Sequence, residues 1–226
     1  MKNHICSLLT VLLALAGSAM AAEPAAQKPK PPADEDRPGL PRVLIIGDSI
    51  SMGYTQPVHE LLKEKANVHR IPTNGGPTKN GTANLDKWLG DGKWDVIHFN
   101  FGIHDLKFMP DGKRQVEPED YEKNLRAIVA KLKATGARVI WATTTPIPDG
   151  DLVPPRSFGK VPEYNALAQR VMKENGVAID DLNAAITPHL AAMQNPKDVH
   201  YKPEGYALLA KQVAESIEAA LAAPAR

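Results

Sequence analysis

A serine near the start of the chain and a histidine near its end form the most suggestive pair of reactive side chains. Ser49 follows the apolar run Val43–Ile46 and the pair Gly47-Asp48, where a helix is predicted to begin. The N-terminus of a helix offers free N–H groups and positive partial charge, which stabilise a developing oxyanion. His200 can accept the proton that a serine hydroxyl must lose to become a nucleophile. Each residue also has an ordinary interpretation, Ser49 as a helix N-cap and His200 as a solvated loop histidine.

Alternating strands and helices are predicted to position these two residues. Short apolar runs predict five strands, and apolar residues at helical spacing predict helices between them. This alternation is typical of one α/β domain with a parallel sheet and helices on both faces. The predicted strands are residues 43–46, 68–71, 95–101, 138–143 and 177–179, and the predicted helices are residues 51–65, 82–90, 118–135, 162–175, 184–193 and a final segment from 203.

Polar residues follow each predicted strand, and they share one edge of the sheet because the carboxyl ends of parallel strands lie together. They are Asp48-Ser49, residues 73–76, His104-Asp105, residues 143–145 and Asp180-Asp181. A serine, glycines, a histidine and carboxylates at one edge resemble a hydrolytic site rather than a phosphate-binding loop. The sequence lacks the phosphate-loop, dinucleotide and zinc-protease motifs, and it also lacks the G-x-S-x-G elbow of α/β-hydrolases.

The first 41 residues are predicted to lie outside the folded domain. Residues 1–22 have a polar start, an apolar run and the small-residue site Ala19-Met20-Ala21, as in a cleaved signal peptide. Residues 23–41 are rich in proline and are predicted to form a disordered linker before the domain of residues 42–226. We therefore expect an exported protein, periplasmic or secreted, with no membrane span after cleavage. Cys6, the single cysteine, leaves with the signal, which excludes thiolate chemistry.

Charge and composition exclude nucleic acid as a partner. The chain has 27 Lys+Arg against 26 Asp+Glu, so it lacks the basic excess of a nucleic-acid-binding protein. Aromatic residues make up 5% of the chain, which leaves few side chains to stack on bases. The sequence carries no indication of the oligomeric state.

Four blocks of the sequence together resemble the SGNH, or GDSL, hydrolases. In the order of that family they are Gly47–Ile50, Gly76–Thr78, Gly102–Asp105 and Asp198–His200. The resemblance covers residues 42–226 and implies a three-layer α/β/α fold of flavodoxin-like architecture with a five-stranded parallel sheet. It implies that Ser49 is the nucleophile and His200 the general base. It also implies that the backbone N–H groups of Ser49 and Gly76 stabilise the oxyanion.

Two positions depart from that family pattern. The third block usually carries an asparagine that donates to the oxyanion, and here His104 takes that place, where a neutral imidazole can donate one N–H. The last block usually has an aspartate three residues before the histidine, where this chain has Lys197 and Asp198 follows one residue late. Either the loop is rearranged so that Asp198 still reaches His200, or a Ser-His dyad works with a backbone carbonyl that orients the ring. We favour Asp198.

These observations predict an exported serine esterase that cleaves small acyl esters. The expected substrate is an acetyl ester of a carbohydrate. The reaction is expected to pass through an acyl-serine intermediate and to need no cofactor. Asn74 and Asp105 are predicted to contact the substrate, and no metal site is predicted. One alternative is a catalytically degenerate domain that binds an acylated glycan. Another is a hydrolase whose metal is held by the histidines and aspartates of the last two blocks. His98, inside the third predicted strand, is expected to be a core residue.

Overall fold

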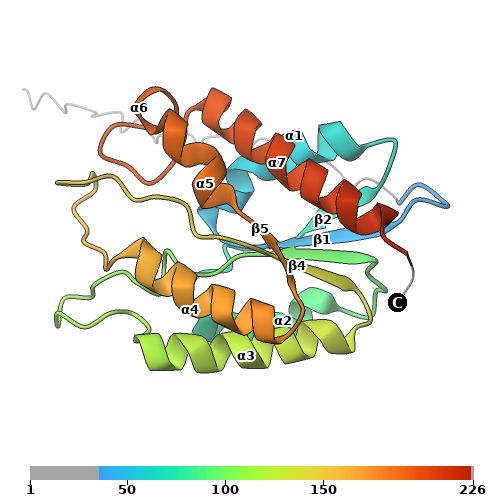
Figure 1. The fold of residues 1–226 in the computed structure, drawn as a ribbon, viewed down its shortest axis with the longest axis horizontal. Helices are drawn as coiled ribbons and strands as arrows, with labels where there is room; N and C mark the ends of the chain where they lie inside the picture. The colour runs from blue at the N-terminus through green and yellow to red at the C-terminus, as the bar shows by residue number, and fades with distance from the viewer. Residues whose placement is uncertain (1–35, 225–226) are drawn as a thin grey trace, which may run out of the picture. The chain divides into compact units, whose positions relative to one another are not determined.

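The computed structural model describes residues 36–224. Their centre is a parallel sheet of five strands in the order β2-β1-β3-β4-β5 (Figure 1). The strands are β1 (Arg42–Ile46), β2 (Asn67–Arg70), β3 (Val96–Phe99), β4 (Arg138–Ala142) and β5 (Ala178–Asp180). The predicted strands and the predicted flavodoxin-like architecture are confirmed, with small shifts at the strand ends.

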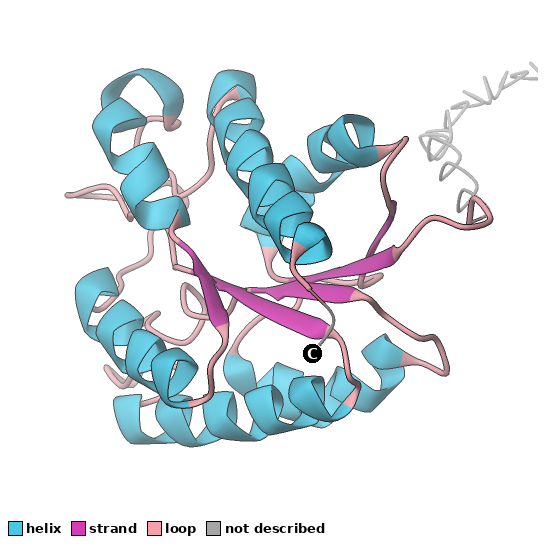
Figure 2. Ribbon diagram, turned by 45° about the vertical axis from the view of Figure 1, so that its right-hand side comes forward, coloured by secondary structure: helices cyan, strands magenta, loops and turns pink. Residues whose placement is uncertain are grey.

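Helices cover both faces of this sheet and complete three layers (Figure 2). One face carries α2 (Thr78–Leu89), α3 (Pro118–Ala134) and α4 (Val161–Glu174), and the other carries α1 (Ser49–Leu62), α5 (Leu182–Ile186) and α7 (Pro203–Ala222). Gly53 lets α1 and α7 approach closely, because a Cβ at this position would lie 2.1 Å from the Tyr206 ring. The first helix of the fold is therefore held firmly by the last one.

Strand β1 shows why the apolar runs become central strands. Successive side chains of a strand point to opposite faces of the sheet. Leu44 and Ile46 pack into the core under α2, α3 and α4, whereas Val43 and Ile45 pack under α1 and α7. Each of these side chains is at most 2% exposed, and full burial of such a side chain contributes roughly 1.5–3 kcal/mol. A strand buried on both faces requires this unbroken apolar run.

The strand order brings two loops together at the carboxyl end of β1. The chain passes from β1 to β2 on one side, and β3 lies against β1 on the other. Ligands bind at such a reversal point in open α/β sheets, because the flanking connections run to opposite faces and leave a crevice. The loops that follow β1 and β3 contain two of the four blocks, so the fold itself places the candidate site there.

The folded unit begins at Asp36, earlier than the predicted boundary at residue 42. Arg37 donates its backbone N–H to the Asn67 side chain at 2.9 Å and its guanidinium to the Lys63 carbonyl at 2.6 Å. Asp36 pairs with Arg42 at 2.6 Å. The charged end of the predicted linker thus packs on the domain instead of remaining disordered. The predicted signal peptide of residues 1–22 and the linker up to residue 35 lie outside the described residues.

The predicted helix of residues 184–193 is in fact broken into three short elements. These are α5, the 3₁₀ turn η1 (Thr187–His189) and α6 (Leu190–Met193). Pro188 is the physical reason, because proline has no N–H to continue the helical hydrogen bonds. Between residues 36 and 224, no helix has both the length and the apolar character to cross a membrane.

Candidate active site

Ser49 is the first residue of α1, and Asp48 caps that helix. The Asp48 carboxylate accepts the Ile50 N–H at 2.9 Å. The N-cap position therefore belongs to Asp48, and the interpretation of Ser49 as the cap is wrong. The Ser49 N–H has no acceptor among the described residues. It remains available at the positive end of the helix.

The Ser49 hydroxyl lies against His200, which comes from the other end of the chain. Ser49 Oγ is 2.8 Å from His200 Nε2. The second ring nitrogen, Nδ1, is 2.9 Å and 3.0 Å from the two carboxylate oxygens of Asp198. With the Nδ1–H donating to Asp198, Nε2 accepts from the serine hydroxyl. The three side chains form one continuous chain of hydrogen bonds, so His200 is not a merely solvated histidine.

Asp198 reaches the ring because the loop before it turns sharply. Lys197 has φ +57°, a left-handed conformation that is uncommon for a residue with a side chain. The Asp198 N–H donates to the Asn195 carbonyl at 3.2 Å, and the Asn195 N–H donates to the His200 carbonyl at 2.9 Å. Of the two arrangements that the sequence left open, the structure shows the rearranged loop, with Asp198 rather than a backbone carbonyl at the ring.

The surroundings of Asp198 keep its carboxylate ionised. Burial raises its pKa, and the hydrogen bond from His200 lowers it. The Val199 N–H at 2.8 Å and the Arg156 guanidinium at 2.6 Å add to the effect, so the pKa of Asp198 lies below its ordinary value. An ionised Asp198 holds the proton of the ring on Nδ1 and leaves Nε2 free to accept from Ser49.

The loop after β2 lies beside the end of β1, but its glycine N–H is already used. The Gly75 N–H donates to the Gly47 carbonyl at 3.0 Å, which holds the two loops together. The Gly76 N–H donates to Asn74 Oδ1 at 2.9 Å in a local turn. The prediction of Gly76 as an open oxyanion donor is therefore not met in this structure, whereas the substrate contact of the exposed Asn74 stays a prediction. Gly76 can donate to an oxyanion only after Asn74 releases it.

His104 follows β3 and stands where the sequence predicts a third donor. Its ring makes no hydrogen bond or ion pair with any described residue. Burial is the largest influence and lowers its pKa, which nearby Asp48 opposes. Positive charge on Lys107 and Arg156 lowers the pKa further. The imidazole is thus neutral near pH 7 and has one N–H to offer.

Asp105 does not face the substrate, contrary to the prediction. Its side chain is fully buried and accepts from the Thr78 N–H at 2.8 Å and the Thr78 hydroxyl at 2.5 Å. Because Thr78 opens α2, this carboxyl ties the second block to the third from inside the molecule. The prediction failed because neighbouring loop residues differ in burial: His104 is partly exposed, whereas Asp105 is buried in the core.

The buried carboxyl of Asp105 predicts a pH-dependent stability. Burial raises its pKa to about 7, against the hydrogen bonds from Thr78, whereas an unfolded aspartate titrates near 4. The folded state therefore holds a proton that the unfolded chain releases, and stability falls between about pH 4 and pH 7, by up to about 4 kcal/mol. We expect Asp105→Asn to flatten this dependence. Urea unfolding across that range measures it, with the exposed Asp91→Asn as control, and parallel curves for wild type and Asp105→Asn would contradict it.

Other polar groups at the strand ends have structural partners. His98 is fully buried and lies 2.9 Å from the Asp180 carboxylate, which confirms the prediction that it belongs to the core. Thr144 and Asn165 exchange two hydrogen bonds, of 2.8 Å and 2.9 Å. Within the described residues, no group of three or more His, Cys, Asp or Glu side chains is placed to hold a metal ion. The metal set considered from the sequence is therefore not assembled.

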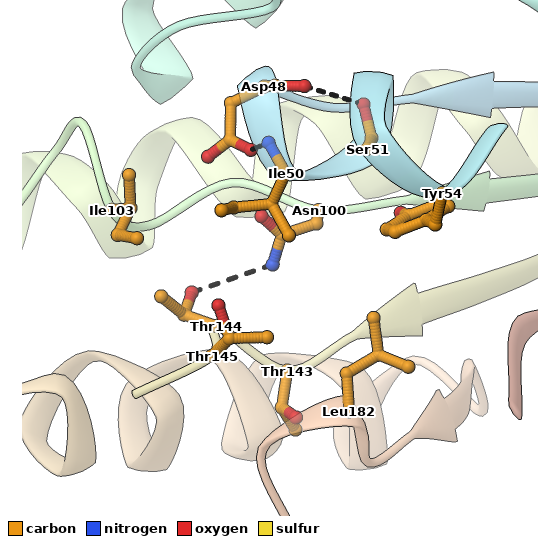
Figure 3. A pocket seen from close by; sticks show the side chains of 10 residues that line it. All are labelled: Asp48, Ile50, Ser51, Tyr54, Asn100, Ile103, Thr143, Thr144, Thr145 and Leu182. Carbon is orange, nitrogen blue, oxygen red and sulfur yellow. Dashed lines mark hydrogen bonds between the residues drawn. The ribbon is translucent and has the colours of Figure 1, made fainter. Parts of the chain in front are cut away.

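A small cavity lies between the start of α1 and the segment that follows β4 (Figure 3). Its volume of about 10 Å³ is room for roughly one water molecule. In Figure 3, Asp48 and Ser51 lie above it and the threonines that follow β4 lie below it. It is lined by Asp48, Ile50, Ser51, Tyr54, Asn100, Ile103, Thr143, Thr144, Thr145 and Leu182. Such a cavity is too small for an acyl group, so a substrate must bind in the open crevice.

An open groove of about 1080 Å³ lies beside the site. The proline-rich segment 146–162 forms most of its lining, together with Asn183, Thr187 and Leu190. Arg156 belongs to this lining and also contacts Asp198 at 2.6 Å. The groove therefore adjoins the carboxylate that orients His200. Sequence reasoning missed Arg156, because no spacing links a loop arginine to an acid 42 positions later.

A flavodoxin-like α/β/α domain with hydrogen-bonded Ser, His and Asp side chains at the point where the strand order reverses is typical of a serine hydrolase. Residues 45–208 match the GDSL-like lipase/acylhydrolase family. The chain belongs to this family, as the four blocks indicated.

Similar proteins carry names of ester hydrolases. An arylesterase of Vibrio mimicus is 28% identical over 110 residues, which are 44% of this chain and 52% of that protein. The match spans about half the length of that curated relative.

Solved structures of similar fold cover most of the chain. An acetyl xylan esterase, AlAXEase, has a TM-score of 0.67 and 17% identity, over 78% of this chain and 99% of that one. A lipase/acylhydrolase from Enterococcus faecalis has a TM-score of 0.68 and 22% identity, over 80% and 96%. A variant of an acetyl xylan esterase from Geobacillus stearothermophilus has a TM-score of 0.64 and 22% identity, over 78% and 94%. At these identities the likeness concerns the fold.

Proposed function

We propose that this protein is a serine esterase that cleaves small acyl esters through an acyl-serine intermediate. The observation that carries the proposal is the continuous chain from Ser49 Oγ to His200 Nε2 at 2.8 Å and from His200 Nδ1 to Asp198 at 2.9 Å. A nucleophile, a base and an acid that orients the base are the minimum for this chemistry. The family match over residues 45–208 supports the same reaction class.

The geometry suggests how the reaction proceeds. Ser49 Oγ attacks the ester carbonyl carbon as its proton passes to His200 Nε2, and the carbonyl oxygen becomes an oxyanion. The C–O bond to the alcohol then breaks, and the alcohol leaves with the proton from His200. A water molecule, deprotonated by the same nitrogen, attacks the acyl-serine. The acid is released and Ser49 regains its hydroxyl.

In this proposal three donors stabilise the oxyanion. The Ser49 N–H has no other acceptor among residues 36–224, and His104 supplies the N–H of a neutral ring. The Gly76 N–H is the third, and the substrate must first displace Asn74 from it. Loss of one such donor costs roughly 100–1000-fold in rate in a well-studied serine hydrolase. The set of oxyanion donors is therefore only partly available before the substrate binds.

For the substrate, we propose an acetyl ester on a carbohydrate. We also propose that residues 1–22 act as a signal peptide, so that the protein meets this substrate after export. The acetyl xylan esterases among the structural neighbours support this choice, as does an open groove of about 1080 Å³ with room for a bulky alcohol. The engaged Gly76 N–H favours a second candidate, a domain that binds an acylated glycan without cleaving it.

Two measurements with the wild-type protein separate these candidates. We expect turnover of p-nitrophenyl acetate and covalent labelling by a fluorophosphonate, with the added mass located by peptide mapping on Ser49. Both results follow from a hydroxyl that His200 activates. Binding of acetylated xylan without turnover and without labelling would favour the binding domain. Turnover without a label on Ser49 would contradict the proposed nucleophile.

A further inference from the structure

Among residues 36–224, Arg156 is the one group outside the Ser-His-Asp chain that forms an ion pair with the orienting acid. It lies in the proline-rich loop between β4 and α4, and its Nη2 is 2.6 Å from Asp198 Oδ1. The two side chains are 21% and 26% exposed, so solvent screens the pair only in part. An arginine here comes from a different loop than His200, and nothing in the four sequence blocks requires it.

The hydrogen bonds of Asp198 divide between its two oxygens. Oδ1 accepts from Arg156 at 2.6 Å and from the Val199 N–H at 2.8 Å, and it lies 3.0 Å from His200 Nδ1. Oδ2 has His200 Nδ1 as its one partner in the described part of the chain, at 2.9 Å. The anchors on Oδ1 fix the plane of the carboxylate, and Oδ2 is left for the imidazole. Arg156 therefore contributes to the direction in which the acid faces the ring.

The loop of Arg156 also holds the backbone of the acid loop. The Val153 N–H donates to the carbonyl of Lys197, the residue with φ +57°, at 2.8 Å. The Gln194 side chain donates to the Pro146 carbonyl at 3.1 Å. A left-handed residue with a side chain is kept in place by surrounding contacts of this kind. The Arg156 loop is thus joined to the loop of residues 194–202 at its first residue, at the turn before Asp198 and at the Asp198 carboxylate.

The Arg156 loop is itself fixed on its other side. The Phe108 N–H donates to the Ser157 carbonyl at 2.9 Å, and the Gly159 N–H donates to the Leu106 carbonyl at 2.7 Å. These bonds join it to the loop that follows β3 and carries His104. Arg156 is therefore presented to Asp198 from a loop with its own anchors, not from a free surface chain.

We propose that Arg156 is a positioning residue, which compensates for an acid placed one residue late by holding Asp198 in the plane that His200 needs. The proposal rests on the proposed esterase function. In this proposal Arg156 acts on catalysis mainly through Asp198, because its hydrogen bond is to the acid and not to the His200 ring or the serine hydroxyl. Its charge also lowers the pKa of His104, but burial is the larger influence there. Removal of Arg156 is therefore expected to cost most while Asp198 is present.

A double-mutant cycle on p-nitrophenyl acetate tests this dependence, because coupled neighbours are not additive. We expect Arg156→Met to lower kcat by about tenfold with KM nearly unchanged, since the substrate carries no charge for the arginine to bind. In the Asp198→Ala background the same change is expected to cost less than about twofold. Arg156→Lys, which keeps the charge and a donor, is expected to recover most of kcat.

Arg114→Met is the matched control. Arg114 lies in the neighbouring loop, is 19% exposed and pairs with Glu163 at 2.8 Å, away from the Ser-His-Asp chain. We expect its loss to leave kcat unchanged. Equal losses from Arg156→Met with and without Asp198, a loss confined to KM, or a loss matched by Arg114→Met would each overturn the proposal. Arg156→Gln carries the same test if Arg156→Met does not fold. Absence of turnover in the wild type would instead reject the esterase function itself.

Discussion

Replacing Ser49 by alanine is expected to lower kcat for p-nitrophenyl acetate by on the order of 10⁵–10⁶-fold. Alanine removes the hydroxyl that lies 2.8 Å from His200 Nε2, and it leaves the fold of α1 intact because Asp48 provides the cap. His200→Ala is expected to cost about as much. The double variant is expected to cost no more than either single one, since the two residues act as one unit. Initial rates against ester concentration, corrected for spontaneous hydrolysis, measure all three.

Two residues of the same types that do not line the groove serve as controls for this result. Ser216 lies on α7 and His189 is exposed, and neither side chain takes part in the Ser-His-Asp chain. Ser216→Ala and His189→Ala are expected to retain wild-type kcat. A loss of less than about tenfold in Ser49→Ala would place ester cleavage elsewhere and remove the proposed mechanism.

The meeting of Ser49 and His200 was predictable from the sequence because it follows from topology. The apolar run that becomes β1 is buried on both faces, so its carboxyl end must emerge at the edge shared by all parallel strands. A serine directly after that run and a histidine ahead of the last helix then reach the same crevice. The roles of these two residues as nucleophile and base were predicted from the resemblance to a family. Their spacing alone also allowed a helix N-cap and a solvated loop histidine.

The details that decide rate were not predictable, because they depend on individual backbone angles and loop contacts. Asp198 meets the ring through the left-handed turn at Lys197, which no pattern of residue types requires. The Gly76 N–H is engaged by Asn74, a local turn that competes with the predicted donor role. Asp105 was assigned to the crevice because it follows His104, yet it points into the core toward Thr78. Single side-chain directions of this kind are set by tertiary packing.

The place of Asp198 makes its replacement the sharpest test of the site. Asp198→Asn is expected to lower kcat by on the order of 10⁴-fold with little change in KM. Asparagine can present its NH₂ group to His200 Nδ1, which then becomes the acceptor and leaves the proton on Nε2, facing Ser49. A ring in that tautomer cannot take the serine proton. Rates of p-nitrophenol release in the first turnover measure this step directly.

Lys197→Gly is the companion variant, because glycine adopts φ +57° without a steric penalty. It keeps the acid in its position and is expected to change kcat by less than about twofold. A kcat for Asp198→Asn within about tenfold of wild type would show that the carboxylate charge is not required, and it would contradict the role proposed for Asp198. Together the two variants separate the effect of the carboxylate from that of the loop that carries it. We expect the reaction to depend on the charge of Asp198, whereas the turn at Lys197 only positions that carboxylate.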